Sequence, residues 1–525
     1  MHSLVRSLTL LPLLLISTGG FTTPKNKRIG STYGSSSLTT TYASIQNFQD
    51  AFSKCKEDIS KTCKVELGSS SLEGGRMGLI ATANIKRGDV VLSMPYDDMI
   101  CLTPAIARNI VYKGVLPDEY DAWTADNGLI ALLILNEVAK ASEEKKGISL
   151  PKRTESTQAF MKAWVELLPS LEECRKLHPI LWSEADQEVL QSSSTKKIYK
   201  ILDDIEEDAA WLTERIWSAD RESFPEEVTL DGNTVPCFSE EGYKWAMALA
   251  TSRSVFTDSS SRLIPFMDFA NHDDKGREVE GGYMGTFGTT NGALLYARKD
   301  YKVGEEVMCS YGPKSAADYV LENGFCPTKA LKTAISEVTF ELDPEDKFYD
   351  DKMDILEFET YDQKPMDPIQ SFDLISEPGR DGEPDAAMFQ FLRLTELGES
   401  DAFLLESIFR QEVWGFMDLP VSEKNEEKVV GKIMDACSKS LDELASMPSG
   451  GPEMCKSLCE AETKALTKTI EYLKREKEAL DLKEYYQERR LKSLGLDSEW
   501  VPEDGVIDPE STAGQTRLPG SGLDW

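Results

Sequence analysis

The stretch Leu-Ile-Pro-Phe-Met-Asp-Phe-Ala-Asn-His at 263–272 decides how this chain is interpreted. An apolar run interrupted by one aspartate leads into an Asn-His pair. Taken alone, such a histidine is more often a structural hydrogen-bonding residue than a catalyst. Three other segments in a fixed order make a functional role more plausible. Ser252-Arg253-Ser254 precedes the Asn-His pair, and Cys309-Ser310-Tyr311-Gly312 and Glu322-Asn323-Gly324-Phe325 follow it. The order of the four segments carries more information than any one of them.

Two similar phrases predict β-structure on either side of a long gap. Residues 85–91 read Ile-Lys-Arg-Gly-Asp-Val-Val, and residues 301–307 read Tyr-Lys-Val-Gly-Glu-Glu-Val. Each pattern predicts a glycine turn flanked by opposite charges and followed by a strand. We therefore expect two β pieces of one small domain, separated by an insertion.

The insertion and the C-terminal third predict helices, because apolar residues recur there at helical spacing. Residues 402–414 indicate an apolar-faced helix, and the leucine stripe from Leu466 to Leu480 indicates a long one. The first ordered part is expected from about residue 65. The expected boundaries are 65–112 and 251–330 for the β domain, 113–250 for the helical insertion, 340–496 for a second helical domain, and 497–525 for a polar, disordered tail.

Composition excludes several classes of function. The 58 basic and 91 acidic residues give a net charge of −33, so phosphate backbones and anionic membranes repel the chain. Three histidines and ten cysteines without a Cys-x-x-Cys pair argue against a zinc site. The economical interpretation is ten free, mostly buried thiols in a reducing compartment.

The amino terminus has the composition of a targeting sequence. Residues 1–20 carry Arg6 and an apolar stretch of about nine residues, which fits a signal-peptide core and is too short to span a bilayer. Residues 21–49 lack acids and are rich in Ser and Thr, as transit peptides are. Together they resemble the bipartite presequences of complex plastids, which favours the plastid stroma; the alternative is the secretory pathway.

The ordered segments, opened by Arg-Met-Gly-Leu at 76–79, resemble the SET-domain methyltransferases. The Pro-x-x-Asp-x-x-Asn-His frame at 265–272 and phrases at 401–409, 419–422 and 484–492 narrow the likeness to the plant Rubisco large-subunit and fructose-bisphosphate aldolase lysine methyltransferases. The resemblance covers residues 66–496. It implies an α+β fold: a SET β-fold interrupted by a helical insertion, followed by an all-α substrate-binding domain.

The resemblance also implies roles for individual residues and S-adenosyl-L-methionine as cofactor, without a metal. Tyr311 is the expected catalytic residue, beside the transferred methyl group. The expected cofactor-binding residues are Gly75, Arg76, Met77, Gly78, Arg253, Asn271, His272 and Phe325. The expected substrate-binding residues are Asp268 and Tyr283. One departure concerns the substrate side: Asn323 stands where the plant enzymes have tyrosine.

Lysine methylation needs an uncharged amine held in line with the methyl group. Positioning contributes about 7–11 kcal/mol, and burial beside a cation lowers the lysine pKa from about 10.4. The expected partner is a plastid protein such as Rubisco large subunit or aldolase. Two alternatives stay open: methylation of a histone, another nuclear protein or an actin histidine, and a non-catalytic binding module with the SET shell.

Overall fold

The computed structural model describes most of the chain: residues 36–60, 62–72, 77–95, 100–117, 120, 122–148, 153–190, 194–257, 260–273, 284–286, 292–311, 314–327, 332–358, 366–409, 412–448 and 452–496. Residues 1–43 and 44–525 form separate compact units. In the first unit the described part is the beginning of helix α1 (Ser36–Ile59). All packing described below lies in the second unit.

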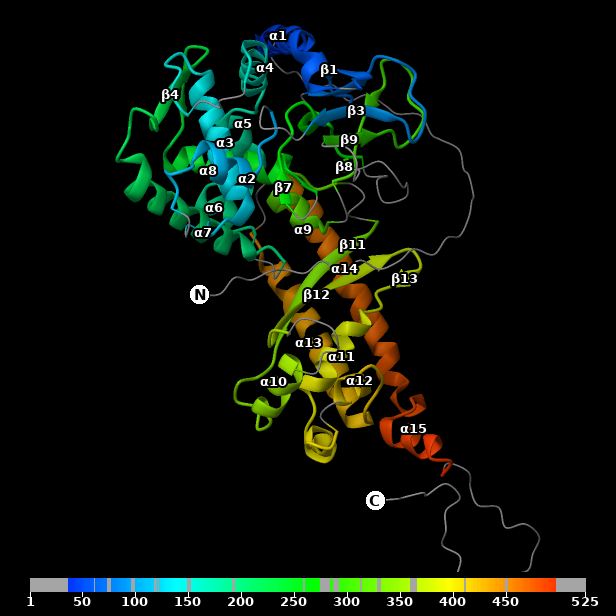
Figure 1. Cartoon of the computed structure of the whole chain (residues 1–525). Coiled ribbons are helices and arrows are strands. Elements are labelled where there is room, and N and C mark those ends of the chain that lie inside the picture. The colour runs from blue at the N-terminus through cyan, green and yellow to red at the C-terminus, as the bar shows by residue number, and fades with distance from the viewer. Residues whose placement is uncertain are drawn as a thin grey trace, which may run out of the picture. The chain divides into compact units, whose positions relative to one another are not determined.

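The β domain is assembled from the two separated pieces, as predicted. One antiparallel sheet has the order β1-β2-β10 and another has the order β3-β9-β8 (Figure 1). Each sheet therefore joins strands from both sides of the insertion. The strands are β1 (Val65–Ser69), β2 (Met77–Ala81), β3 (Val90–Pro95), β8 (Met284–Thr286), β9 (Gly292–Tyr296) and β10 (Glu306–Val307).

The two similar phrases pair with one another. Ile85 and Tyr301, the first residues of the phrases, exchange two backbone hydrogen bonds of 2.9 Å. The turn glycines Gly88 and Gly304 have φ values of 86° and 84°, a region that residues with a Cβ rarely adopt. The repeated sequence thus closes the β domain across more than two hundred residues.

The insertion is helical, with one β-hairpin. Helix α3 (Ala125–Ala141) is buried over most of its length and packs on α8 (Glu240–Arg253), which leads back into the β domain. Ser183 caps the short helix α6, since its hydroxyl accepts from the Asp186 amide. The other elements are α2 (Pro104–Ile106), η1 (Ala107–Val111), α4 (Glu155–Val165), α5 (Leu171–Leu177), η2 (Pro179–Leu181), α6 (Glu184–Gln187), α7 (Lys197–Leu212), η3 (Thr213–Trp217), β4 (Glu227–Leu230) and β5 (Asn233–Pro236).

The prediction that the ordered part begins near residue 65 is wrong. Helix α1 lies beside α4 (Figure 1) and buries Ile45, Phe48 and Phe52 in the core of the β domain. The amide of Gln49 donates to the Leu67 carbonyl of β1 at 2.8 Å. A transit segment ending at residue 49 would include side chains of this core, so the boundary of any such segment lies before residue 45. The signal prediction for residues 1–20 and the tail prediction for 497–525 lie outside the described residues.

The C-terminal domain is not all-α. Strands β11 (Ala334–Glu341), β12 (Ile369–Glu377) and β13 (Arg380–Asp381) form an antiparallel sheet. The expected helix at 402–414 is also wrong, because the 3-10 helix η8 (Glu399–Leu405) and the short α12 (Val413–Phe416) occupy that range. The apolar residues there pack without one continuous helix. The remaining elements are α10 (Tyr349–Phe358), α11 (Ala386–Thr395), α13 (Glu423–Ser446), α14 (Glu453–Glu478), η9 (Leu480–Leu482) and α15 (Tyr486–Ser493).

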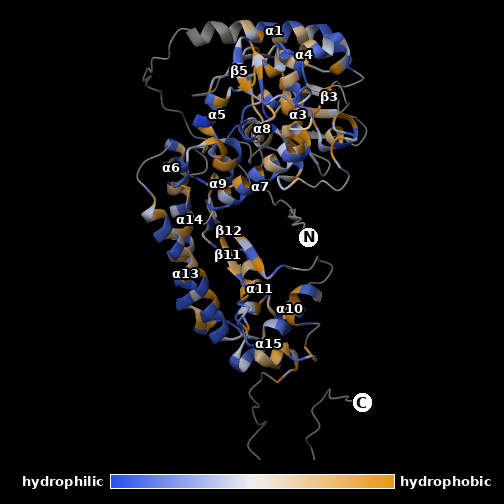
Figure 2. Ribbon diagram, turned by 90° about the vertical axis from the view of Figure 1, so that its left-hand side faces the viewer, coloured by the Kyte–Doolittle hydropathy of each residue, from blue (hydrophilic) through white to orange (hydrophobic). Residues whose placement is uncertain are grey.

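The long helix predicted from the leucine stripe is α14, and it belongs to two hydrophobic cores. Its first half contributes Leu458 and Ala461 to the core of the β domain and insertion. Its second half contributes Leu466 and Leu473 to the core of the C-terminal domain. Figure 2 shows hydrophobic and hydrophilic residues mixed along α13 and α14, as amphipathic helices require.

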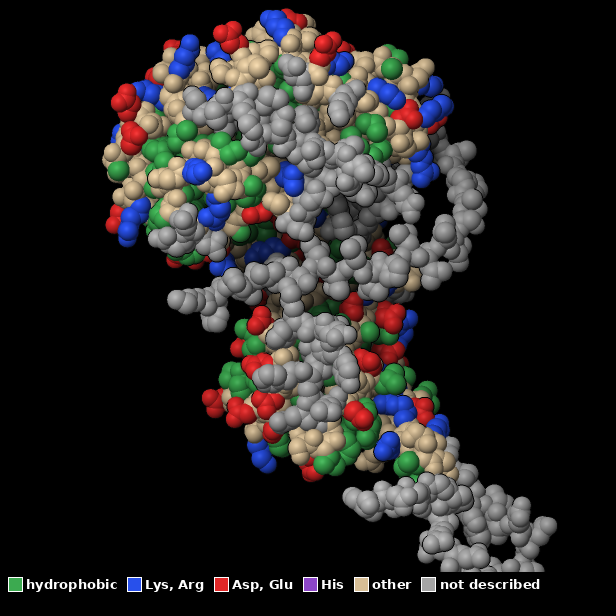
Figure 3. All heavy atoms as spheres, viewed as in Figure 1, with side chains coloured by type: hydrophobic (Ala, Val, Ile, Leu, Met, Phe, Trp, Pro, Cys, Tyr) green, Lys and Arg blue, Asp and Glu red, His purple; other side chains and the backbone are tan. Residues whose placement is uncertain are grey.

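All ten cysteines are free thiols, seven of them buried. Within the described ranges, none of the helices combines the length and apolar character needed to cross a bilayer. On the face drawn in Figure 3, acidic and basic side chains are interspersed with hydrophobic ones.

Candidate active site

The Asn-His pair follows a tight turn that the core holds in place. The 3-10 helix η4 (Met267–Phe269) is preceded by Phe266, whose φ of 79° is unusual for a bulky residue. The Phe266 ring packs edge-on against Phe48 and Phe52 of α1, at centroid distances of 5.3 and 4.7 Å. Packing against α1 therefore compensates a strained backbone next to the site.

The segment after this turn pairs with the segment that carries the tyrosine. The carbonyl of Asn271 accepts from the Cys309 amide at 2.9 Å, and the Cys309 carbonyl accepts from the Asp273 amide at 3.0 Å. This short parallel bridge holds His272 against Cys309. Tyr311, two residues further along, is thereby placed beside His272.

The Asn271 side chain is anchored to a buried carboxylate. Its Nδ2 donates to Glu306 Oε1 at 2.8 Å and to the Met77 carbonyl at 2.8 Å. A Cβ at Gly78 would lie 2.1 Å from Glu306 Oε1 and 3.1 Å from Asn271 Nδ2. Gly78 is therefore required for this close approach of β2 to the Asn271–Glu306 pair.

Four rings gather around the Asn-His segment. The centroid of His272 lies 5.1 Å from Tyr311, 5.0 Å from Tyr319 and 5.9 Å from Phe325. Tyr319 opens the π-turn η6 (Tyr319–Asn323), which follows α9 (Ala316–Asp318). Nδ1 of His272 accepts from the Tyr311 amide at 3.2 Å, so this nitrogen carries no proton. The ring cluster combines aromatic faces with backbone oxygens.

Tyr311 is a hydrogen-bond donor in this cluster. Its hydroxyl donates to the Ala270 carbonyl at 3.1 Å. Burial raises the pKa of Tyr311 above its usual value, and the Cys309 thiol contributes in the same direction. A tyrosine with a raised pKa stays protonated at neutral pH, so Tyr311 orients groups and does not accept a proton there.

Arg253 and Asp268 form a buried pair beside the rings. Arg253 Nη1 donates to Asp268 Oδ2 at 2.9 Å, and Trp164 Nε1 donates to the same oxygen at 3.1 Å. The Asp268 side chain is 0% exposed and the Arg253 guanidinium stacks 5.3 Å from the Phe269 ring. Burial raises the pKa of Asp268, and Arg253 opposes that shift. In this conformation the buried Asp268 carboxylate holds Arg253 in position.

His178 lies behind the π-turn. It is 5% exposed, and its Nδ1 has no hydrogen-bond partner among the residues that the structure describes. A Cβ at Gly324 would lie 3.1 Å from this nitrogen. Burial, and secondarily the charge of Arg253, lower the pKa of His178 to about 4. His178 is therefore a neutral packing residue under the turn that precedes Phe325.

The structure brings most of the predicted site residues together. Met77, Gly78, Asn271, His272, Tyr311 and Phe325 lie around the ring cluster and the Glu306 carboxylate, and Arg253 pairs with Asp268 next to them. Gly75, Arg76 and Tyr283 lie outside the described residues.

Sequence reasoning missed Glu306, Tyr319, Trp164 and His178. The sequence does contain a signal for Glu306. When the two similar phrases are aligned, Glu306 corresponds to Val90, so a charged residue occupies a strand position where the other phrase has an apolar one, and this position is buried. Tyr319 lies four residues before the predicted Asn-Gly-Phe, one helical turn away. Trp164 and His178 come from the insertion, and nothing in the sequence ties them to the site.

Two family models match this chain, one for each part of the fold. The SET domain matches residues 76–312, and the family described as Rubisco LSMT substrate-binding matches residues 343–491. The chain therefore contains a SET domain followed by a domain of the Rubisco LSMT substrate-binding family. The predicted fold class and enzyme class are confirmed, apart from the strands of the C-terminal domain.

The methyltransferase is similar to chloroplast enzymes along most of its length. It is 29% identical to the fructose-bisphosphate aldolase lysine N-methyltransferase of Arabidopsis thaliana, covering 80% of this chain and 82% of the relative. It is 28% identical to the ribulose-1,5-bisphosphate carboxylase/oxygenase large-subunit N-methyltransferase of Pisum sativum, covering 83% of each. A solved structure of Rubisco LSMT bound to AdoMet superposes with a TM-score of 0.66 at 25% identity, over 87% of this chain and 97% of that one.

Proposed function

We propose that this methyltransferase transfers a methyl group from S-adenosylmethionine to a lysine of a plastid protein, with Rubisco large subunit and fructose-bisphosphate aldolase as the candidate substrates. The observation that carries the proposal is the ring cluster of His272, Tyr311, Tyr319 and Phe325 around carbonyl oxygens. Aromatic faces and oxygen atoms suit a sulfonium and an alkylammonium, both of which are cations.

S-adenosylmethionine supplies the methyl group as an electrophile on a sulfonium. On the protein side, we assign cofactor binding to Met77, Gly78, Asn271, His272 and Phe325. The Asn271–Glu306 bond fixes the segment that carries the Asn-His pair, and Arg253 contributes through its pair with Asp268. Gly75, Arg76 and Tyr283 keep the cofactor and substrate roles proposed from the sequence.

Tyr311 is the proposed catalytic residue. Its protonated hydroxyl, now bonded to the Ala270 carbonyl, lies among the rings and can orient the lysine amine by hydrogen bonding. The amine must lose its proton before it attacks. Because its pKa is raised, Tyr311 stays protonated and offers no phenolate to accept this proton. The proton therefore leaves to solvent, and burial of the substrate lysine lowers the pKa of its amine.

The plastid assignment rests on two kinds of support. The aldolase and Rubisco large-subunit methyltransferases that this chain resembles are named chloroplastic, and they align over about four fifths of the chain. Residues 1–43 have the composition of a signal and transit sequence. A fusion of residues 1–43 to a fluorescent protein tests this without any part of the folded core. Plastid fluorescence is expected; a secreted or cytosolic reporter would contradict the assignment.

The activity is tested with tritiated S-adenosylmethionine and bacterially produced, hence unmethylated, Rubisco large-subunit and aldolase polypeptides. Label on either protein is expected with the wild-type enzyme and is expected to be strongly reduced with Tyr311→Phe. Tyr199→Phe is the matched control, since this tyrosine lies on α7 and its hydroxyl donates to the Gln187 carbonyl. Label on histones or actin alone would contradict a plastid substrate. Absence of cofactor binding would favour the non-catalytic module.

A further inference from the structure

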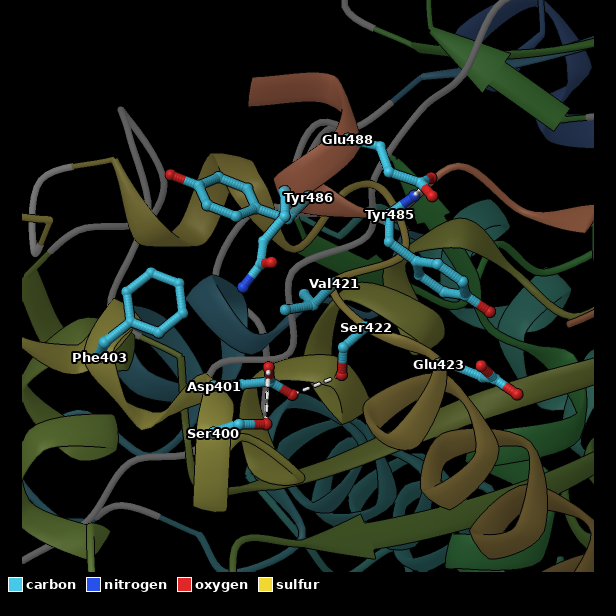
Figure 4. Close-up of a pocket in the computed structure, with 10 residues that line it drawn as sticks. Ser400, Asp401, Phe403, Val421, Ser422, Glu423, Tyr485, Tyr486 and Glu488 are labelled. Atoms are coloured by element: carbon cyan, nitrogen blue, oxygen red, sulfur yellow. Dashed lines mark hydrogen bonds between the residues drawn. The ribbon is translucent and has the colours of Figure 1, made fainter. Parts of the chain in front are cut away.

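A cavity lies in the C-terminal domain, remote in sequence from the residues proposed for methyl transfer. It has a volume of about 280 Å³ and opens between η8, the start of α13 and the start of α15 (Figure 4). The residues that line it all fall within the match to the Rubisco LSMT substrate-binding family. The cavity therefore belongs to the domain associated with protein substrates.

Three aromatic rings line this cavity. The Phe403 and Tyr486 rings lie 6.3 Å apart at 50°, and Figure 4 shows them side by side. Tyr485 lines the opposite side, with Glu423 below its ring in that view. Aromatic faces bind cations through their negative quadrupole, and arginine is the partner they bind most often.

Three carboxylates line the same cavity, and no lysine or arginine does. Asp401 is 8% exposed and is held by the Ser422 hydroxyl at 2.5 Å, a neutral donor. Glu488 accepts from the Tyr485 amide, and Glu423 is exposed in the first turn of α13. Among the described residues, none of the three carboxylates forms an ion pair. Their charge is thus left for a partner outside this chain.

The basic residues at the start of α13 and just after η9 are engaged elsewhere, and Arg489, next to Glu488 on α15, donates to the Glu484 carbonyl. Lys424 and Lys428 both pair with Glu399, and Lys483 pairs with the buried Glu426. Their charges therefore do not neutralise the cavity. Burial raises the pKa of Tyr485 to about 12, and the negative charges of Glu423 and other nearby carboxylates add to the shift.

We propose that this cavity binds a lysine or arginine side chain of the protein substrate, at a position other than the methylated lysine. The rings would cover the aliphatic stem and the flat cationic face, while the carboxylates would bind its N–H groups. That the bound side chain belongs to the methylation substrate rests on the proposed function; the cation specificity rests on the cavity alone. An anionic partner such as nucleic acid would be repelled by the same carboxylates.

The cation specificity is tested with two small probes, Nα-acetyl-L-arginine methylamide and its uncharged counterpart Nα-acetyl-L-norleucine methylamide. Saturation-transfer NMR measures their binding to the whole protein. The arginine probe is expected to bind and to lose most of its signal in Glu423→Gln/Glu488→Gln. Glu427→Gln is the matched control, because it removes a carboxylate from the same helix, one turn from Glu423 and outside the cavity.

Two results would overturn the proposal. The first is equal binding of the two probes to the wild-type protein. The second is unchanged arginine binding in the double variant at an unchanged melting temperature. A further variant, Phe403→Leu, keeps the carboxylates and removes one ring; it is expected to weaken the arginine probe more than the norleucine probe.

The link to catalysis is tested by steady-state kinetics with the methylated protein. The double variant is expected to raise KM for the protein substrate about tenfold, on the scale of losing interfacial charge contacts, with kcat unchanged. An unchanged KM would overturn the assignment to the substrate. Arginine-probe binding without methyl transfer to any protein would contradict the proposed function and leave the cation site standing, so the two failures are distinguishable.

Discussion

Nδ2 of Asn271 lies 2.8 Å from Oε1 of Glu306, and this bond joins two segments of the SET domain that neighbour each other only in the fold. The same carboxylate accepts from the Ser70 hydroxyl at 2.9 Å and from the amide and hydroxyl of Ser71 at 2.6 Å. Ser70 and Ser71 precede the segment 75–78, which is proposed to bind the cofactor. One buried carboxylate thus fixes two sides of the proposed cofactor site.

Replacing Glu306 by glutamine should weaken cofactor binding. The amide has one acceptor oxygen where the carboxylate has two, and charge-assisted bonds contribute about 1.5–3 kcal/mol each. We expect the Kd for S-adenosylmethionine to rise about tenfold or more by isothermal titration calorimetry. Glu305→Gln is the control, since this exposed neighbour only closes the turn at Lys302. Equal Kd values in the two variants would contradict the positioning role of Glu306.

Gly78→Ala should damage the same network through sterics. The new methyl group would lie 2.1 Å from Glu306 Oε1, so the carboxylate or β2 has to move. Overpacking of this kind costs about 1–3 kcal/mol, and cofactor affinity should fall with the melting temperature. Gly431→Ala on α13 is the matched control because nothing lies within 4 Å of its Cβ position. A melting temperature as high as that of this control would show that β2 can relax.

The sequence was sufficient to predict the divided β domain, since the two similar phrases carry the glycine turns that close it. It was also sufficient to predict that Asn271, His272 and Tyr311, which belong to short local motifs, lie together in the fold. Those motifs resemble motifs of the SET-domain family, whose members have the same fold. The family's site positions could therefore be assigned to the matching residues of this chain.

Features that depend on contacts across the fold escaped prediction. Helix α1 carries Phe48 among polar residues, and only the packing on Phe266 reveals that it belongs to the core. The helical domain predicted over 340–496 includes β12, and most of β11 lies outside any predicted domain, although β11 alternates buried and exposed residues over its second half. The sequence does not reveal how Glu306 is held, because the groups that donate to it belong to Ser70, Ser71 and Asn271, far away in the sequence.

Tyr311→Phe should lower kcat and leave cofactor binding nearly unchanged. Removal of one positioned hydrogen-bond donor from a catalytic site costs about a hundredfold or more in kcat. Because burial holds the pKa of Tyr311 above 10, the wild-type rate should rise with pH as the substrate lysine loses its proton, with no decline from tyrosine ionisation up to pH 9. Single-turnover rates from pH 7 to 9 measure this. A decline above pH 8 that disappears in Tyr311→Phe would contradict the donor role.

His178 should make the protein sensitive to mild acid. Its pKa is about 4 in the fold against 6.5 for the free side chain, so the unfolded chain binds a proton that the native state does not. The free energy of unfolding should therefore fall by about 3 kcal/mol as the pH drops from 6.5 to 4. His178→Leu should remove that part of the pH dependence. Urea unfolding followed by circular dichroism, with both proteins at each pH, measures the difference; parallel pH curves would contradict it.

Asp268→Asn distinguishes positioning of Arg253 from contact with the substrate. Loss of the carboxylate leaves Arg253 without its buried counter-charge, and breaking such a pair costs about 3–5 kcal/mol. We expect a lower melting temperature and a higher Kd for S-adenosylmethionine, with KM for the protein substrate little changed. Asp300→Asn, which breaks an exposed pair with Lys86, is the control and should have a small effect on both. If Asp268 instead touches the substrate, KM rises and the cofactor Kd stays constant, because the two constants report opposite sides of the transferred methyl group.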